Sequence, residues 1–388
     1  MNQYSTTAIQ TPSTPSPLQS VERDLLDQTG AAALAWCGRA ATALYWAYRL
    51  ARLRQPQNQQ PEVIMPAIMC GTPANVAYLA GMTPRFADID PQTGLITLEA
   101  IQARVSPQTC AVVIVHLFGQ TVDLSAISLW CKQNGIVLIE DIAQALGAHL
   151  PDHAPVGSAG DMAVFSFNKT KILESGGGAL IVRHAEDEQA LHHLLQTEPL
   201  PQLAEPERIQ QLGLSYRNLH HSLVGLLRQN AAAEQDVSAS FLRLRPSYDA
   251  LYRAPMPENS SLSRDWLTLA DVVARRFQKA KLYTTFLENG PWTLLDGWLT
   301  SGVCWRFSLL LDDPKETALL SEQVRKDGFH VSNLYWPANQ LFYPQDRCPA
   351  AADFARRIIN LWVDDSVDAQ WIERCCVSIR QHSTLVKN

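Results

Sequence analysis

AVVIVHLFGQTVDLSAISLWCKQNGIVLIED, residues 111–141, contains the pattern that decides the fold. Two short apolar stretches, 111–116 and 136–141, flank a segment at 124–134 whose apolar residues repeat at helical spacing and which Gly135 closes. Apolar stretches of this length are typical of buried strands. The order strand, helix, strand therefore predicts a parallel sheet that helices cover on both faces.

The same alternation extends upstream and weakens downstream. We expect further elements of the large sheet and its helices at residues 38–54, 62–66, 72–81, 84–89 and 179–182. A long amphipathic helix at 269–287 and a strand at 303–311 indicate a smaller C-terminal α+β unit. The predicted organisation is a mobile polar arm (1–22), a large α/β domain (23–265) with an insertion around 228–265, and a small domain (266–388).

Composition excludes several classes of protein. The chain has 388 residues and a net charge of −6, so it offers no basic face for nucleic acid. Its first 20 residues contain no Lys, no Arg and no apolar core of the kind that a signal peptide has. No apolar run elsewhere approaches the roughly 20 residues that a helix needs to cross a bilayer. The eight cysteines are scattered, without His partners at zinc spacing. We expect no membrane segment, no metal site, and reduced thiols in a cytoplasmic protein.

Polar residues follow the buried strand that ends near residue 141. Ligands of open parallel sheets collect at the carboxyl ends of the strands, and Asp141 stands at such an end. A buried carboxylate is costly unless it meets a cation or several donors, and a protonated ring nitrogen is one such cation. Ala143 leaves a flat surface for an aromatic ring, and Gln144 can donate to a phenolic oxygen. Considered alone, Asp141 could instead be a helix N-cap.

A second segment, VGSAGDMAVFSFNKTK at 156–171, places a hydroxyl and a lysine in one turn. Ser166 ends an apolar strand and suits a phosphate, and Lys171 follows five residues later. Lys169 in the same turn is the alternative candidate. The five-residue spacing from Ser166 favours Lys171 over Lys169 as the reactive lysine. The glycines at 176–178 allow the backbone to turn closely around a ligand, although a flexible turn before a strand is the simpler interpretation.

Taken in order, D-x-A-Q-A (141–145), VGxxGDxxxFSFxxTK (156–171) and GGG (176–178) resemble the DegT/DnrJ/EryC1/StrS family of sugar aminotransferases. GRAATAL at 38–44 and LYWP at 334–337 extend the resemblance over most of the chain. The resemblance implies a pyridoxal 5′-phosphate (PLP) enzyme of fold type I. Its large domain would have a mainly parallel sheet covered by helices, and a smaller α+β domain would follow.

The resemblance also implies a role for individual residues. Lys171 would form the internal aldimine with the cofactor, and Asp141 would contact the pyridine nitrogen. Ala143 would pack on the ring face and Gln144 would lie near the phenolic oxygen. The implied phosphate ligands are Ser166, Gly38 and Arg39.

The implied reaction transfers an amino group from glutamate or glutamine to a nucleotide-linked keto sugar or to a related cyclic ketone. The cofactor would alternate between PLP and pyridoxamine phosphate (PMP) in a homodimer with shared active sites. A catalytically impaired PLP-binding or regulatory homologue is one alternative. A PLP/PMP-dependent sugar dehydratase is another, but Lys171 argues against it because those relatives replace the lysine with histidine.

Two positions depart from the family pattern. Cys70, or Met69 in a shifted register, takes the place of an aromatic residue that stacks on the cofactor ring. Ser215 takes the place of an asparagine in the loop that reaches the partner subunit. His116 is equally compatible with a structural role and with a cofactor or substrate contact. Tyr335 and Trp336 could line the acceptor pocket or pack in the core.

Overall fold

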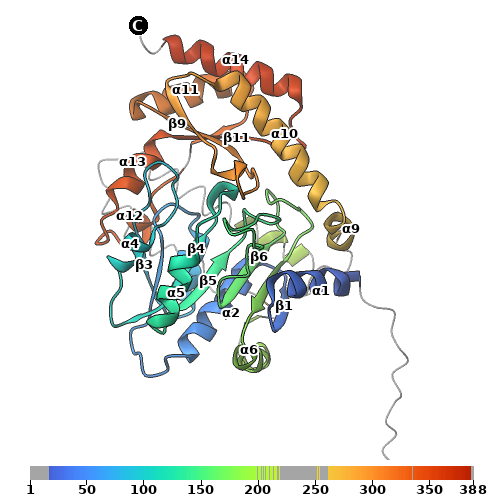
Figure 1. The fold of residues 1–388 in the computed structure, drawn as a ribbon, viewed down its shortest axis with the longest axis vertical. Helices are drawn as coiled ribbons and strands as arrows, with labels where there is room; N and C mark the ends of the chain where they lie inside the picture. Colours follow the sequence, from blue (N-terminus) through green and yellow to red (C-terminus); the bar gives the residue numbers. More distant parts are fainter. Residues whose placement is uncertain are drawn as a thin grey trace, which may run out of the picture.

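The computed structural model of the chain describes residues 17–198, some positions between 200 and 253, and residues 261–385 except 334. These residues form a seven-stranded sheet and a four-stranded sheet, with helices packed on both (Figure 1). Most of the insertion expected around 228–265 lies outside the described residues. None of the helices in the described part combines the length and the apolar character that crossing a membrane requires.

The large sheet has the strand order β1-β7-β6-β5-β4-β2-β3. Strands β2 to β6 run parallel, and β7 runs antiparallel to both of its neighbours, β6 and β1. The strands are β1 (Ala33–Cys37), β2 (Glu62–Pro66), β3 (Thr83–Ala87), β4 (Thr109–Val115), β5 (Val137–Asp141), β6 (Met162–Ser166) and β7 (Gly178–Val182). The mainly parallel sheet predicted from the sequence is confirmed.

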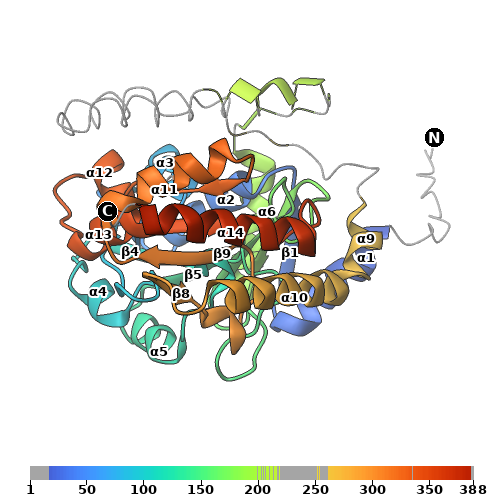
Figure 2. The same cartoon turned by 90° about the horizontal axis from the view of Figure 1, so that it is seen from above.

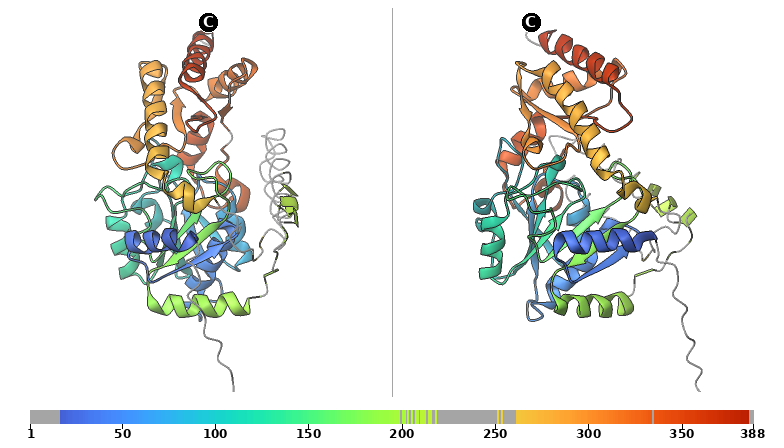
Figure 3. Two further views of the ribbon diagram at one scale, coloured as in Figure 1. Left: turned by 90° about the vertical axis from the view of Figure 1, so that its right-hand side faces the viewer. Right: turned by 45° about the vertical axis from the view of Figure 1, so that its right-hand side comes forward.

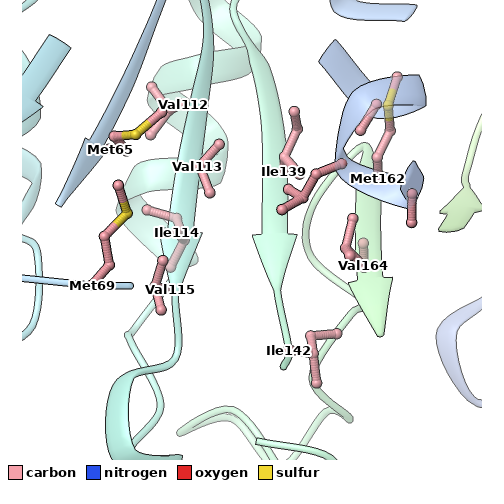
Figure 4. Close-up of a cluster of buried hydrophobic side chains, with 14 of the residues drawn as sticks. Met65, Met69, Val112, Val113, Ile114, Val115, Ile139, Ile142, Met162 and Val164 are labelled. Carbon is pink, nitrogen blue, oxygen red and sulfur yellow. The ribbon is translucent and has the colours of Figure 1, made fainter. Parts of the chain in front are cut away.

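The strands are apolar because helices bury both faces of the sheet. Every residue of β4, β5, β6 and β7 is buried. Figure 4 shows side chains of β2, β4, β5 and β6, among them Met65, Ile114, Ile139 and Val164, in one apolar cluster. The covering helices are α2 (Ala40–Leu53), α3 (Thr72–Leu79), α4 (Leu98–Gln102), α5 (Ser125–Gln133) and α6 (Ala185–Thr197).

The N-terminal boundary differs from the prediction. Helix α1 (Pro17–Thr29) begins inside the stretch expected to be a mobile arm (1–22). Its Val21 and Leu25 lie one helical turn apart and are 0% and 2% exposed. Because this pair buries an apolar stripe against the large domain, residues 17–22 belong to that domain, and the predicted boundary at 22 is wrong.

The small domain is built on an antiparallel sheet of order β10-β11-β9-β8. Helices α10, α11 and α14 pack around it and share a separate apolar core (Figure 2). Its elements are α10 (Leu269–Leu287), β8 (Trp292–Leu295), β9 (Phe307–Leu311), α11 (Pro314–Lys326), β10 (Val331–Ser332), β11 (Ile358–Leu361) and α14 (Ala369–Leu385). The short helix α9 (Leu262–Trp266) precedes α10 (Figure 3), whose bounds agree with the predicted helix.

Two helices of this C-terminal half pack on the large domain instead. Helix α12 (Ala338–Phe342) places Phe342 in a stacked contact with Phe86 of β3, and Asp346 binds the guanidinium of Arg85 at 2.8 Å. Helix α13 (Pro349–Arg357) joins the same core. The chain after residue 266 therefore contributes to both domains.

The strand expected at 303–311 begins only at Phe307. Residues 303–305 instead bind the short 3-10 turn at Leu117–Gly119, where the amide of Val303 donates to the carbonyl of Gly119 at 2.8 Å. Gly119 has φ +84°, and a Cβ there would lie 1.7 Å from the carbonyl oxygen of Val303. Glycine is therefore required where the small domain meets the end of β4.

Candidate functional site

Asp141 lies buried at the carboxyl end of β5, between the ends of β4 and β6. It is 5% exposed, and the amide of Ala143, 2.9 Å away, is the carboxylate's only hydrogen-bond partner among the described residues. Burial raises the pKa of Asp141, although the Ala143 amide and the charge of Lys171 oppose this effect. Within the described part of the chain no side-chain cation binds the carboxylate, and its remaining lone pairs suit a protonated ring nitrogen.

Glu140, the residue before it, serves a different purpose on the opposite face of β5. Its carboxylate accepts hydrogen bonds from the amides of Gly157 (2.8 Å), Ala159 (2.9 Å) and Gly160 (2.6 Å) and lies 3.2 Å from His116 Nε2. Burial alone would raise the pKa of Glu140, but these partners outweigh it and hold the pKa below its usual value. His116 Nδ1 accepts from the amide of Val122. With both ring nitrogens engaged, the buried His116 has a structural role.

We expect Glu140→Gln to lower the free energy of unfolding by about 3 to 5 kcal/mol, because its amide group would face backbone donors inside the protein. The folded-state pKa of Glu140 is depressed, so its contribution is present above the ordinary carboxyl pKa and is lost as the pH falls through the folded value. Urea unfolding should show that the free energy of unfolding changes less between pH 7 and pH 4 in the variant than in the wild type. Glu99→Gln, at an exposed position, is the control. Equal stability of wild type and Glu140→Gln at pH 7 would contradict the assignment.

Lys171 follows β6 in a turn that approaches Asp141. Its side chain is half-buried, whereas Lys169 is exposed, and its charge acts on the pKa of Asp141. Its Nζ lies 6.0 Å from the ring centre of Trp305. A cavity of about 510 Å³ beside this turn is lined by Lys171, Arg276, Arg306 and Trp362, among others. Of the two lysines, Lys171 is the one whose charge lowers the pKa of Asp141.

Ala143 and Gln144 occupy the segment directly after Asp141, and both are half-buried. The side-chain oxygen of Gln144 accepts from the amide of Phe118 at 2.7 Å. Since that amide must meet an acceptor, the contact defines the orientation of the carboxamide and leaves its NH₂ group as a donor. Both residues thus lie beside the buried acid, and the Gln144 amide group is available to donate.

Ser166, Gly38 and Arg39 meet at the N-terminus of α2. Ser166 is 5% exposed and pairs with Gly178 across β6 and β7, while Arg39 pairs with Gly177 in an isolated bridge. A Cβ on Gly178 would lie 2.6 Å from the amide nitrogen of Ala40, the first residue of α2. Glycine thus brings the strand against the start of α2, whose N-cap residue Arg39 forms no side-chain capping hydrogen bond to the helix. A hydroxyl beside the N-terminus of a helix is a donor set that fits a phosphate.

The two family departures lie in different surroundings. Cys70 is exposed directly before α3 and contributes to the raised pKa values of Tyr48 and Tyr335, which burial mainly causes. Tyr48, buried in α2, also senses the charge of Asp141. Ser215 is exposed on helical backbone. Cys70 therefore lies close enough to Tyr48 and Tyr335 to influence both of their pKa values.

Sequence reasoning missed an aromatic cluster between the two domains. The rings of Phe118 and Trp305 stack with centres 6.3 Å apart, and Tyr335 meets Phe118 edge-on at 5.2 Å. The guanidinium of Arg306 lies between Trp305 and Trp362, 4.5 and 4.6 Å from their ring centres. A charged residue inside the apolar run VCWRFSLLL was the available signal. Trp336 lines a second cavity of about 670 Å³, and Tyr335 borders both that cavity and the cluster.

The parallel sheet, the buried acid ending β5 and the lysine turn after β6 define the fold of a type I PLP-dependent transferase. The model of the DegT/DnrJ/EryC1/StrS aminotransferase family matches residues 12–218, more than half of the chain, and the chain belongs to this family.

Three relatives illustrate the match. An L-glutamine:2-deoxy-scyllo-inosose aminotransferase of Streptomyces kanamyceticus is 39% identical over 134 residues, which cover 34% of this chain and 31% of the relative. A dTDP-4-dehydro-2,3,6-trideoxy-D-glucose 4-aminotransferase of Saccharopolyspora spinosa is 26% identical over an alignment that covers 79% of this chain and 74% of the relative. The PLP form of the putative sugar aminotransferase Spr1654 from Streptococcus pneumoniae superimposes with a TM-score of 0.74 at 17% identity, covering 96% and 92% of the two chains. The first match spans only about a third of that relative's length, and the solved structure establishes the fold alone.

Proposed function

We propose that this chain is a PLP-dependent aminotransferase that transfers an amino group to a keto sugar or a related cyclic ketone, with Lys171 as the cofactor lysine. The observation that carries the proposal is a buried Asp141 that no side-chain cation of the described residues binds, together with the half-buried Lys171, whose charge acts on its pKa. When bound, the cofactor supplies an aldehyde that bonds to amines and an electron-poor ring that accepts the electrons of a broken Cα–H bond.

The residues at the strand ends match the chemical groups of this cofactor one by one. The carboxylate of Asp141 would pair with the protonated ring nitrogen and keep it protonated. Ala143 would support the ring face, and the NH₂ group of Gln144 would donate to the phenolic oxygen. Ser166 and the backbone at Gly38 and Arg39 would bind the phosphate at the start of α2.

In its free state, the amine of Lys171 would move the proton between the substrate's Cα and the carbon that the cofactor aldehyde provides. A positioned acid or base of this kind contributes roughly 10²- to 10⁴-fold to a rate. Asp141 would remain ionised through both halves of the reaction, because its partner keeps a positive charge beside it.

Relatives support the substrate classes. The names of two relatives specify a cyclic ketone with L-glutamine and a nucleotide-linked keto sugar. We therefore propose glutamate or glutamine as the donor, and we propose that PLP and PMP alternate. A homodimer would let the segment that carries Ser215 reach the phosphate of the partner's site, where serine offers a shorter donor than asparagine.

The proposal is tested by the absorbance of the purified protein after addition of PLP. We expect a visible band from the lysine-bound cofactor, which L-glutamate or L-glutamine bleaches within seconds to minutes and which a keto-sugar acceptor restores. D-Glutamate is the matched control. A band that no amino donor changes would overturn the proposal and favour a PLP-binding regulatory protein, for which the substitutions at Cys70 and Ser215 would then be the first explanation.

A further inference from the structure

Thr170, directly before Lys171, adopts an unusual backbone conformation. Its φ is +70°, in the left-handed region that side chains branched at Cβ disfavour. Such a residue keeps this conformation only if its surroundings hold it there. The carboxylate of Glu174 accepts from the amide of Thr170 at 2.9 Å, and the indole Nε1 of Trp305 donates to its carbonyl at 2.5 Å. The backbone N–H and C=O of Thr170, on either side of its φ and ψ angles, are thus both restrained.

Trp305 is itself held firmly, although it belongs to the small-domain half of the chain. It is 8% exposed, its amide donates to the carbonyl of Phe118 at 3.2 Å, and its ring stacks on Phe118. The guanidinium of Arg306 lies 4.5 Å from its ring centre. The indole N–H therefore has a defined direction, toward the turn that carries Lys171.

A second bridge joins the same two segments. Arg276 donates through Nη1 to the carbonyl of Trp305 at 3.2 Å and through Nη2 to the carbonyl of Lys171 at 3.5 Å. The side chain of Lys171 then extends so that its Nζ faces the Trp305 ring at 6.0 Å. The carbonyls of Thr170 and Lys171 are thus both bound by groups from the C-terminal half of the chain.

We propose that Trp305 is a positioning residue that directs Lys171 toward the cofactor by holding Thr170 in its left-handed conformation. This role rests on the proposed function, since it presumes that Lys171 is the cofactor lysine. The contact between Trp305 and Thr170 makes the orientation of the Lys171 side chain depend on how the small domain docks on the large domain.

A double-mutant cycle tests the coupling. Trp305→Phe keeps a ring on Phe118 but removes the N–H donor, and Thr170→Gly adopts a positive φ without help. We expect Trp305→Phe to weaken PLP binding about 5- to 10-fold, the effect of one hydrogen bond, and to slow attachment to the lysine. In the Thr170→Gly background the same change should weaken binding less than about 2-fold. An equal loss in both backgrounds, or no loss in either, would overturn the proposal.

Two further measurements make the result specific. Glu174→Ala removes the other restraint on Thr170, so it should also weaken PLP binding, again only when Thr170 is present. Trp130→Phe, on α5, is the matched tryptophan control and should leave PLP binding unchanged. Borohydride trapping of each variant identifies the labelled lysine. If Lys171 is labelled throughout but no coupling is found, only this inference fails; if another residue is labelled, the proposed function fails.

Discussion

Lys171→Ala is expected to abolish covalent attachment of PLP and to lower the transamination rate by about 10³-fold or more. The substitution removes both the amine that bonds to the cofactor and the group that moves the proton at Cα. Borohydride reduction followed by peptide mapping should yield a pyridoxyl-labelled peptide containing Lys171 in the wild type and none in the variant. Single-turnover absorbance with glutamate measures the loss of rate.

The neighbouring lysine supplies the matched control. Lys169 is exposed two residues earlier in the same turn, so Lys169→Ala should keep the label and a rate within about 2-fold of the wild type. A label on Lys169, or a working enzyme without Lys171, would contradict the assignment and require a different lysine.

Asp141→Asn is expected to lower turnover by about 10²- to 10³-fold while leaving the protein without cofactor as stable as the wild type, or more so. Asparagine retains an oxygen for the amide of Ala143 but cannot compensate a protonated ring nitrogen. Burial raises the pKa of Asp141 in the folded protein, so its ionised form costs stability above the ordinary carboxyl pKa, and this cost disappears as the pH falls. The variant should therefore lack that penalty at pH 7.

These opposite effects separate a functional acid from a structural one. Urea unfolding of the cofactor-free proteins, PLP titration and turnover should be measured together, with exposed Asp152→Asn as the control. If stability and turnover fall in parallel, Asp141 serves the fold and not the cofactor.

The family relationship and the central sheet could be predicted because their signals are local. Five-residue apolar strands such as β5 and β6 are readable without knowledge of their neighbours, since both faces are buried and nearly every side chain must be apolar. Parallel strands end at one edge of a sheet, and Asp141 and Ser166 are the last residues of two neighbouring parallel strands. Lys171 could be chosen over Lys169 from spacing alone, and the exposed position of Lys169 agrees.

Other features depend on contacts between residues far apart in the sequence. The start of β9 was misplaced because residues 303–305 look like a strand but bind the turn after β4. The apolar stripe of α1 has a local pattern, yet only the neighbouring large domain gives it a surface to bury against. His116 was undecided until Glu140 and Val122 were seen to engage both ring nitrogens.

The sequence by itself indicated strands β2 to β7 of the large sheet and predicted an acid and a lysine beside their ends, because strand burial and strand-end position follow from short-range pattern, whereas β1 was not predicted. Only the tertiary structure decided how that lysine is held. Trp305 stands well over a hundred residues from Thr170 in the chain, and their hydrogen bond arises from the docking of one domain on the other. Hydrogen bonds between residues that domain packing brings together produce no periodic pattern in the sequence. The tertiary structure is therefore needed to identify them.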